Sequence, residues 1–138
     1  LSEAFGGAYL KGAFAGRRGG AKTLLLDQSI VAGLGNIYVC EALHRARVSP
    51  VRPASALSGR KLADLARAVR SILEEAIAAG GSTLRDYAGA DGALGYFQHR
   101  FEAYGRAGEA CGSPGCGGAI VRIVQAGRST YYCPVCQR

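Results

Sequence analysis

The sequence contains no methionine, not even at its first position, where Leu1 stands. Because an initiator methionine is usually removed only before a small residue, we expect the chain to be a piece of a longer protein. It also lacks an apolar run near the roughly 20 residues that a membrane span needs, and no charged-then-apolar signal segment opens it. These absences predict a soluble protein that has no membrane partner.

Acidic residues are scarce relative to basic ones. Ten Asp and Glu stand against 17 Lys and Arg, which leaves a net charge of +7. An excess of this size in a short chain favours a polyanionic partner, with nucleic acid ahead of a membrane surface. The alternative is that the charge only keeps the protein soluble. Hydrophobic residues make up 49% of the 138 residues, which is enough to form a core.

Complete nucleotide-binding motifs are also missing. The stretch VAGLGNIY contains Gly33 and Gly35, but Tyr38 occupies the place of the third glycine of a dinucleotide loop, and no P-loop lysine follows. We therefore expect no small-molecule cofactor. The two glycines instead predict a helix that starts near Asn36, where free N–H groups and the positive dipole end suit a phosphate. Alternatively, Asn36 only caps its own helix.

Helical periodicity is strongest in the middle of the chain and predicts a helix over about 59–79. Its apolar stripe consists of Leu62, Leu65, Ala66, Val69, Ile72, Leu73, Ala76 and Ile77. Another helix is expected over 36–45, and two prolines within 48–55 predict consecutive turns between them. The unit reads helix, two turns, helix. Residues 2–15 predict a further helix. The residues expected to bound these helices are Ser2, Ser58, Gly80 and Gly81.

Cysteines are few, and four of the five lie near the end of the chain, at Cys111, Cys116, Cys133 and Cys136. The segment between the pairs reads as two strands joined by a turn at 125–127. Such a hairpin brings four thiolates together, which is the donor set of tetrahedral zinc. Four protein ligands leave no open position, so we expect one structural Zn²⁺. The alternative of two disulfides is disfavoured by the absent signal segment, the unpaired Cys40 and the CPVC knuckle.

Four other residues carry chemistry that the pattern leaves open. Arg128 follows the hairpin turn, where it can contact a phosphate or a nucleic-acid groove, or stay exposed without a partner. Cys40 lies on the inward face of its helix and is expected to be a buried thiol rather than a nucleophile. His44 and His99 are expected at surface or partly buried positions outside the metal site.

Several long motifs occur together in one order. They are LLLDQSIVAGLGNIYVCEALHRARVSP, GGSTLRDYAGADGALGYF, YGRAGEAC and GRSTYYCPVCQ. Together they resemble the C-terminal half of bacterial formamidopyrimidine-DNA glycosylase, from Leu1 to Gln137. The resemblance implies a mainly α fold, with a helix–two-turns–helix DNA-binding domain over 1–100 and a small zinc-bound β-hairpin over 101–138. It also implies a monomer that binds damaged double-stranded DNA in the bacterial cytoplasm, associated with the nucleoid.

The resemblance further implies roles for single residues. Some would contact the phosphates around a damaged nucleotide, and others would lie in the glycine-rich, aperiodic loop at about 82–100, which would fold over an extruded base. The residues implied are, for the DNA phosphates, Lys22, Gly35, Asn36 and Arg128, and, for the lesion loop, Thr83, Arg85 and Tyr96. The parent protein would be a bifunctional DNA glycosylase and lyase that removes oxidised purines (8-oxoguanine, formamidopyrimidines) through a Schiff base.

The chain departs from the family pattern at three places. The family nucleophile is an N-terminal proline followed by a glutamate, whereas this chain opens Leu1-Ser2-Glu3, so we expect it to bind DNA without catalysis. The first cysteine pair is C-x4-C where the family usually has C-x2-C. Arg85 stands where we expect a family lysine.

Two other functions fit parts of the pattern. A sister family, similar to endonuclease VIII, repairs oxidised pyrimidines with a comparable helical domain and zinc hairpin, but the DGALGYF loop favours the purine-specific branch. A stand-alone zinc-ribbon module that binds protein would show little salt dependence, whereas DNA binding falls steeply with salt.

Overall fold

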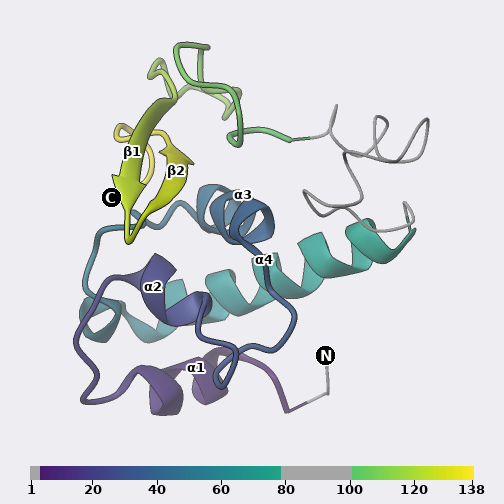
Figure 1. The fold of residues 1–138 in the computed structure, drawn as a ribbon, viewed down its shortest axis with the longest axis vertical. Coiled ribbons are helices and arrows are strands. Elements are labelled where there is room, and N and C mark those ends of the chain that lie inside the picture. Colours follow the sequence, from purple (N-terminus) through teal and green to yellow (C-terminus); the bar gives the residue numbers. More distant parts are fainter. Residues whose placement is uncertain (1–3, 79–100) are drawn as a thin grey trace.

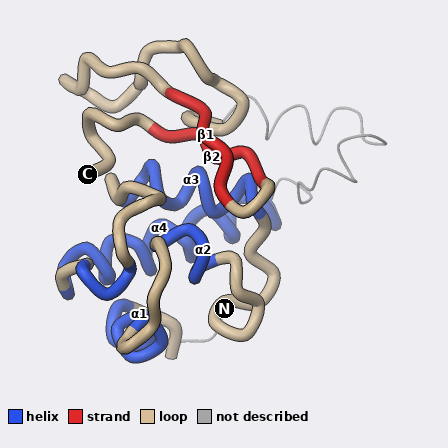
Figure 2. The backbone as a smooth tube through the Cα atoms, turned by 60° about the vertical axis from the view of Figure 1, so that its left-hand side comes forward, coloured by secondary structure: helices blue, strands red, loops and turns tan. Residues whose placement is uncertain are grey.

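The computed structural model describes residues 4–78 and 101–138, and this part of the chain is mostly helical. Its elements are α1 (Gly7–Phe14), α2 (Ala21–Leu25), α3 (Asn36–Ala46), the 3-10 helix η1 (Ala54–Ala56), α4 (Gly59–Ala78), β1 (Val121–Gln125) and β2 (Arg128–Tyr132). The long helix α4 crosses the middle of the molecule, with α1 on one side of it and α3 on the other (Figure 1). The β-hairpin lies on the far side of α3 (Figures 1 and 2). The predicted mainly α fold followed by a small hairpin is confirmed.

Helix α4 forms because its apolar residues recur on one face. Leu62, Leu65, Val69 and Ile72 are all buried, and they pack between α1 and α3. The predicted N-cap is confirmed: the Ser58 hydroxyl accepts the Lys61 backbone N–H at 3.2 Å.

The prediction that Ile77 belongs to this stripe is wrong, because its side chain is 78% exposed. One residue along a helix is a rotation of about 100°, and Ala76 is the residue that faces the core. No helix in the described ranges has the length and apolar character needed to cross a membrane.

Two sets of turns flank α3. Between α3 and α4, a turn at Pro50 and Val51 is followed by η1, so the predicted pair of turns is present, with the second as a 3-10 turn. A further set of turns over 28–33 joins α2 to α3. The Asp27 carboxylate stabilises it by accepting hydrogen bonds from Ser29 N–H at 2.9 Å and Ser29 Oγ at 2.6 Å.

The first helix begins later than predicted. It runs from Gly7 to Phe14 instead of over 2–15, and Gly6 precedes it without a side-chain cap. The expected cap Ser2 lies outside the described residues, as does the loop at 82–100. Leu10 and Phe14 are the buried residues of α1, because only one face of so short a helix can reach α4.

The segment that leads into the C-terminal hairpin is tied to α3 by a buried carboxylate. Glu41 is fully buried, and it accepts backbone N–H groups of Glu102 at 2.7 Å, Ala103 at 3.0 Å and Tyr104 at 2.8 Å. Burial raises the pKa of Glu41, and the three N–H donors, which favour the carboxylate, oppose that effect. This contact fixes where the chain re-enters the helical part.

Candidate nucleic-acid interface and metal centre

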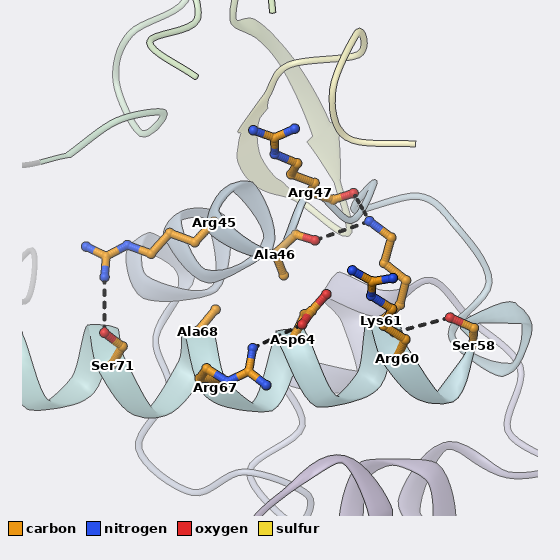
Figure 3. A pocket seen from close by; sticks show the side chains of 10 residues that line it. All are labelled: Arg45, Ala46, Arg47, Ser58, Arg60, Lys61, Asp64, Arg67, Ala68 and Ser71. Carbon is orange, nitrogen blue, oxygen red and sulfur yellow. Dashed lines mark hydrogen bonds and ion pairs between the residues drawn. The ribbon is translucent and has the colours of Figure 1, made fainter. Parts of the chain in front are cut away.

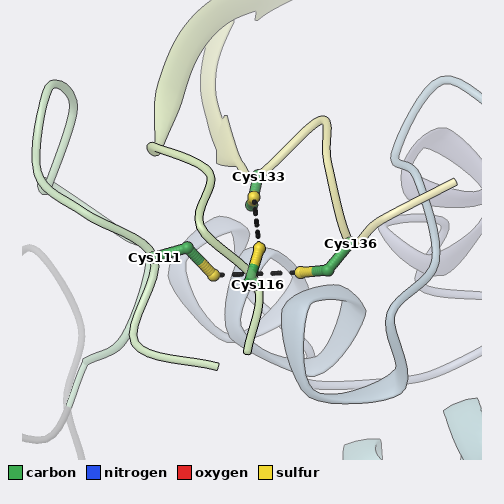
Figure 4. Close-up of side chains that lie close together, drawn as sticks. All are labelled: Cys111, Cys116, Cys133 and Cys136. Carbon is green, nitrogen blue, oxygen red and sulfur yellow. Dashed lines mark hydrogen bonds between the residues drawn. The ribbon is translucent and has the colours of Figure 1, made fainter. Parts of the chain in front are cut away.

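The four C-terminal cysteines converge at the end of the hairpin (Figure 4). The sulfur atoms of Cys111, Cys116, Cys133 and Cys136 all lie within 4.8 Å of one another. Two Sγ–Sγ distances are 3.8 Å and 3.5 Å, close to the edge of about 3.8 Å that a tetrahedron with Zn–S bonds near 2.3 Å would have. A disulfide needs about 2.05 Å, and all five cysteines are free. The four thiolates fit one structural zinc ion.

The surroundings of Cys111 favour its thiolate form. Burial alone would raise the pKa of Cys111, but hydrogen bonds from the Ser113 backbone and from His44 lower it to about 6. Gly118 lets the chain approach closely, because a Cβ there would lie 2.8 Å from the Cys133 sulfur atom. The C-x4-C pair takes part in this cluster despite its looser spacing.

The expectation that His44 is a surface or partly buried residue is wrong. Its side chain is 1% exposed, and Nε2 lies 3.3 Å from the Cys111 sulfur atom. Nδ1 lies 3.4 Å from a Glu102 carboxylate oxygen. Burial opposes the charged form, but these two groups raise the pKa of His44 to about 9. The sequence held a signal for this burial, because His44 follows the inward-facing Cys40 by one helical turn. His99 lies outside the described residues.

Three of the residues predicted to contact DNA meet at the tip of the hairpin. Lys22 of α2 donates from Nζ to Thr130 Oγ1 at 2.5 Å and to the Ser129 carbonyl at 3.2 Å. Asn36 donates from Nδ2 to the same carbonyl at 3.0 Å. Arg128, the neighbouring residue, is exposed at the start of β2. Lys22, Asn36 and Arg128 are far apart in the sequence, and the fold brings them together.

The alternative in which Asn36 caps its own helix does not hold. Gly35 is the N-cap of α3, no side chain caps the helix, and Asn36 is its first residue. The amide of Asn36 instead reaches across to the hairpin. The first N–H groups of α3 therefore lack a side-chain acceptor, which is the arrangement that binds anions at helix N-termini.

Lys22 is buried, with its side chain 1% exposed. Burial is the main cause that lowers its pKa; Cys40 opposes this effect, and the positive charge of Arg128 adds to it. Its ammonium group is engaged by the hairpin, so the contact with a phosphate stays a prediction. Cys40 is also buried, and burial raises the pKa of its thiol, which agrees with the expected structural role.

The hairpin turn presents Arg128 beside a recess. Ala126 and Gly127 have φ values of 50° and 77°, the pair of positive values that a tight two-residue hairpin turn needs. Lys22, Asp27 and Arg128 are among the residues that line a recess of about 200 Å³ between the turn and α2. Sequence reasoning missed Ser129 and Thr130 as the residues that hold Lys22. Thr83, Arg85 and Tyr96, predicted for the lesion loop, lie outside the described residues.

Known proteins share both the sequence and the fold. Formamidopyrimidine-DNA glycosylases of Phenylobacterium zucineum and of Caulobacter sp. are 67% and 60% identical over 100% and 99% of this chain. The chain covers 48% of each, so it spans about half the length of the curated relatives it matches.

Two solved structures show the same fold. The crystal structure of the MutM (Fpg) protein of Thermus thermophilus matches 99% of this chain and 52% of that chain, with a TM-score of 0.85 and 46% identity. A complex between the Lactococcus lactis Fpg and DNA that contains an abasic site matches 100% of this chain and 50% of that chain, with a TM-score of 0.87 and 38% identity.

Two family models divide the chain between them. The zinc finger found in FPG and IleRS matches residues 108–138, which agrees with the four-cysteine site and confirms one structural zinc. The formamidopyrimidine-DNA glycosylase H2TH domain matches residues 1–88. The resemblance stated from the sequence is confirmed: the chain belongs to the formamidopyrimidine-DNA glycosylase H2TH family.

Proposed function

We propose that this chain is the DNA-binding half of a DNA glycosylase that removes oxidised purines from duplex DNA. The observation that carries the proposal is the meeting of Asn36, Lys22 and Arg128 at the hairpin tip. The similarity to an Fpg that was solved with DNA containing Fapy-dG supports the lesion class. The similarity to Fpg complexes with abasic-site DNA supports damaged duplex as the partner.

The proposed DNA contacts divide into two kinds. The exposed Arg128 guanidinium and the uncapped N–H groups of α3 bind phosphate oxygens directly. Lys22 and Asn36 hold the hairpin backbone in place, so that Arg128 faces the same side as the start of α3. The zinc ion, bound by the four thiolates, makes the hairpin rigid enough to keep this geometry.

The chemical step requires more than this chain. An amine must reach C1′ of the damaged nucleotide to form a Schiff base, and the relatives are about twice as long as the chain. We therefore assign the nucleophile to the other half of the full-length protein. This chain binds the DNA and so positions the damaged base for that step.

A salt titration of duplex binding tests the proposal. The chain should bind a duplex with an abasic-site analogue, and its affinity should fall steeply as salt rises. Arg128→Ala should weaken binding and reduce the magnitude of the salt slope by about one. Lys11→Ala, which removes an exposed charge on α1, is the matched control and should change neither the affinity nor the slope. Equal behaviour of the two variants would contradict the assignment of Arg128.

Two further measurements sharpen the assignment. If Lys22 acts through the hairpin, Lys22→Met should weaken DNA binding and leave the salt slope unchanged; a slope reduced by about one would instead show a direct phosphate contact.

For the full-length protein, borohydride should trap a covalent adduct with DNA that contains 8-oxoguanine. Trapping only with oxidised pyrimidines would contradict the lesion class.

A further inference from the structure

A cavity of about 650 Å³ lies between the C-terminal end of α3 and the first half of α4 (Figure 3). Its lining is dominated by basic side chains, namely Arg45, Arg47, Arg60, Lys61 and Arg67. Asp64 is the acidic residue among them. The cavity is at the opposite end of α3 from Asn36. An 11-residue helix is about 16 Å long, so the cavity is separate from the proposed DNA contacts.

Not all of these charges are paired within the protein. Arg67 pairs with Asp64 at 3.1 Å, and Arg45 pairs with Glu75. Lys61 donates to the carbonyls of Ala46, the last residue of α3, and of Arg47, its C-cap. The guanidinium groups of Arg47 and Arg60 are exposed, and within the described ranges neither makes an ion pair or a hydrogen bond. The cavity therefore presents an uncompensated positive charge.

Arg47 is a costly residue for its backbone position. It caps α3 with φ 58° and ψ 39°, which is the left-handed region, and glycine is preferred at such positions because a Cβ is strained there. The side chain at this position is a long, exposed cation that can reach a ligand. In Figure 3 its guanidinium lies above the end of α3, on the side of the hairpin.

The basic surface continues past Arg47 toward the zinc knuckle. Arg47 also lines a second cavity of about 370 Å³, together with Pro114, Val135 and Arg138. Val135 is 43% exposed, so this end of the surface has an apolar wall beside a cation. We call the two cavities joined at Arg47 the basic groove.

We propose that the basic groove binds an acidic segment of a partner protein. Its carboxylates would pair with the guanidinium groups of Arg47 and Arg60, which favour bidentate contacts with carboxylates, and an apolar side chain would lie on Val135. A single extended chain can enter recesses of this size, whereas a duplex, whose major groove alone is about 12 Å wide, is too broad to enter them. Because the groove lies at the opposite end of α3 from Asn36, we expect Arg47→Gly to leave duplex binding unchanged.

Binding of a fluorescent peptide tests this proposal independently of the DNA-binding function. The probe is a short peptide rich in Asp and Glu that ends in Leu, and the zinc-loaded chain is titrated against it. Arg47→Gly should weaken peptide binding about tenfold, since a charge-assisted pair is lost. The melting temperature of this variant should not fall, because glycine fits the backbone. Arg18→Gly, at an exposed position between α1 and α2, is the matched control and should bind the peptide normally.

Three outcomes would overturn the proposal. The first is unchanged peptide binding by Arg47→Gly, and the second is equal affinity for a Lys-rich peptide. The third is evidence that the groove binds nucleic acid. This would be either a matching loss of duplex affinity in Arg47→Gly or displacement of the peptide by single-stranded oligothymidylate at equal concentration. Val135→Ser should lower the affinity for the peptide that ends in Leu and leave the affinity for a peptide without Leu unchanged. An equal loss of affinity for both peptides would contradict the proposed contact between Leu and Val135.

Discussion

Lys22 and Asn36 donate hydrogen bonds to the same acceptor, the main-chain oxygen of Ser129, at 3.2 Å and 3.0 Å. One residue comes from α2 and the other from the first position of α3. The shared carbonyl belongs to the residue next to Arg128, so two helices jointly determine where that guanidinium stands. A change at either donor should therefore affect the hairpin as well as its own helix.

The buried ammonium of Lys22 should make stability depend on pH. Its pKa is lowered, mainly by burial, so as pH rises the folded state loses this proton before the unfolded state does. The unfolded state then binds more protons at this group, so the contribution of Lys22 to the free energy of unfolding should rise with pH up to about 10.5. The measurement is denaturant unfolding of the chain and of Lys22→Met at several pH values. The free energy of unfolding of the chain, minus that of Lys22→Met, should grow with pH; a constant difference would contradict this reasoning.

Removing the metal should unfold the hairpin and spare the helices. The hairpin has only a small buried cluster, formed by Ala103, Cys111, Ile120 and Cys133, whereas the helices share a large core. After treatment with a strong chelator, amide NMR signals of residues 111–138 should collapse while the helical circular dichroism persists. Intact hairpin signals after verified metal loss would contradict a structural zinc.

The cysteine assignment can be tested with a matched pair of variants. Cys116→Ser removes one of the four clustered sulfur atoms, and Cys40→Ser removes the sulfur that lies outside the cluster. Mass spectrometry under native conditions should find reduced or absent zinc binding in the first variant and unchanged zinc binding in the second. Loss of zinc in both would point to a folding defect, and retention in both would remove Cys116 from the site.

Glu41→Gln should destabilise the protein by about 1–3 kcal/mol. The carboxylate offers two acceptor oxygens to the three buried N–H groups, whereas an amide offers only one. Chemical denaturation measures the change. Glu74→Gln, on the exposed face of α4, is the control and should change stability by less than about 0.5 kcal/mol. Equal small effects would show that the buried carboxylate does not hold the 102–104 segment.

Ala126→Gly should stabilise the hairpin. Ala126 has φ 50° in the turn, where a Cβ costs about 1 kcal/mol that glycine avoids. Ala119→Gly is the control, because Ala119 pairs with Ala110 outside the turn and has no positive φ, so added chain freedom should destabilise it slightly. The melting temperature of the zinc-loaded chain should rise for the first variant and fall for the second; the opposite order would contradict the turn geometry.

Features that depend on neighbouring residues could be predicted from the sequence. The stripe of α4, the Ser58 cap and the turn before β2 all follow from spacing within a few residues. The four zinc ligands also belong to this group, because a hairpin pairs the two ends of one short segment and zinc admits few donor types. The start of α1 was harder to predict from the sequence, because a short helix is stabilised by its packing on α4 more than by its own sequence.

The sequence by itself determined the long helix α4, the hairpin and the donor set of the metal. Only the tertiary structure decided that Lys22 is buried under β2, that His44 lies against Cys111 and that Glu41 holds 102–104. Each of these contacts joins residues more than 60 positions apart. The contacts of Lys22 and Glu41 also involve main-chain groups, which every residue carries. The local sequence pattern does not predict which backbone group a side chain will contact, because that depends on how α2, α3 and the hairpin pack together.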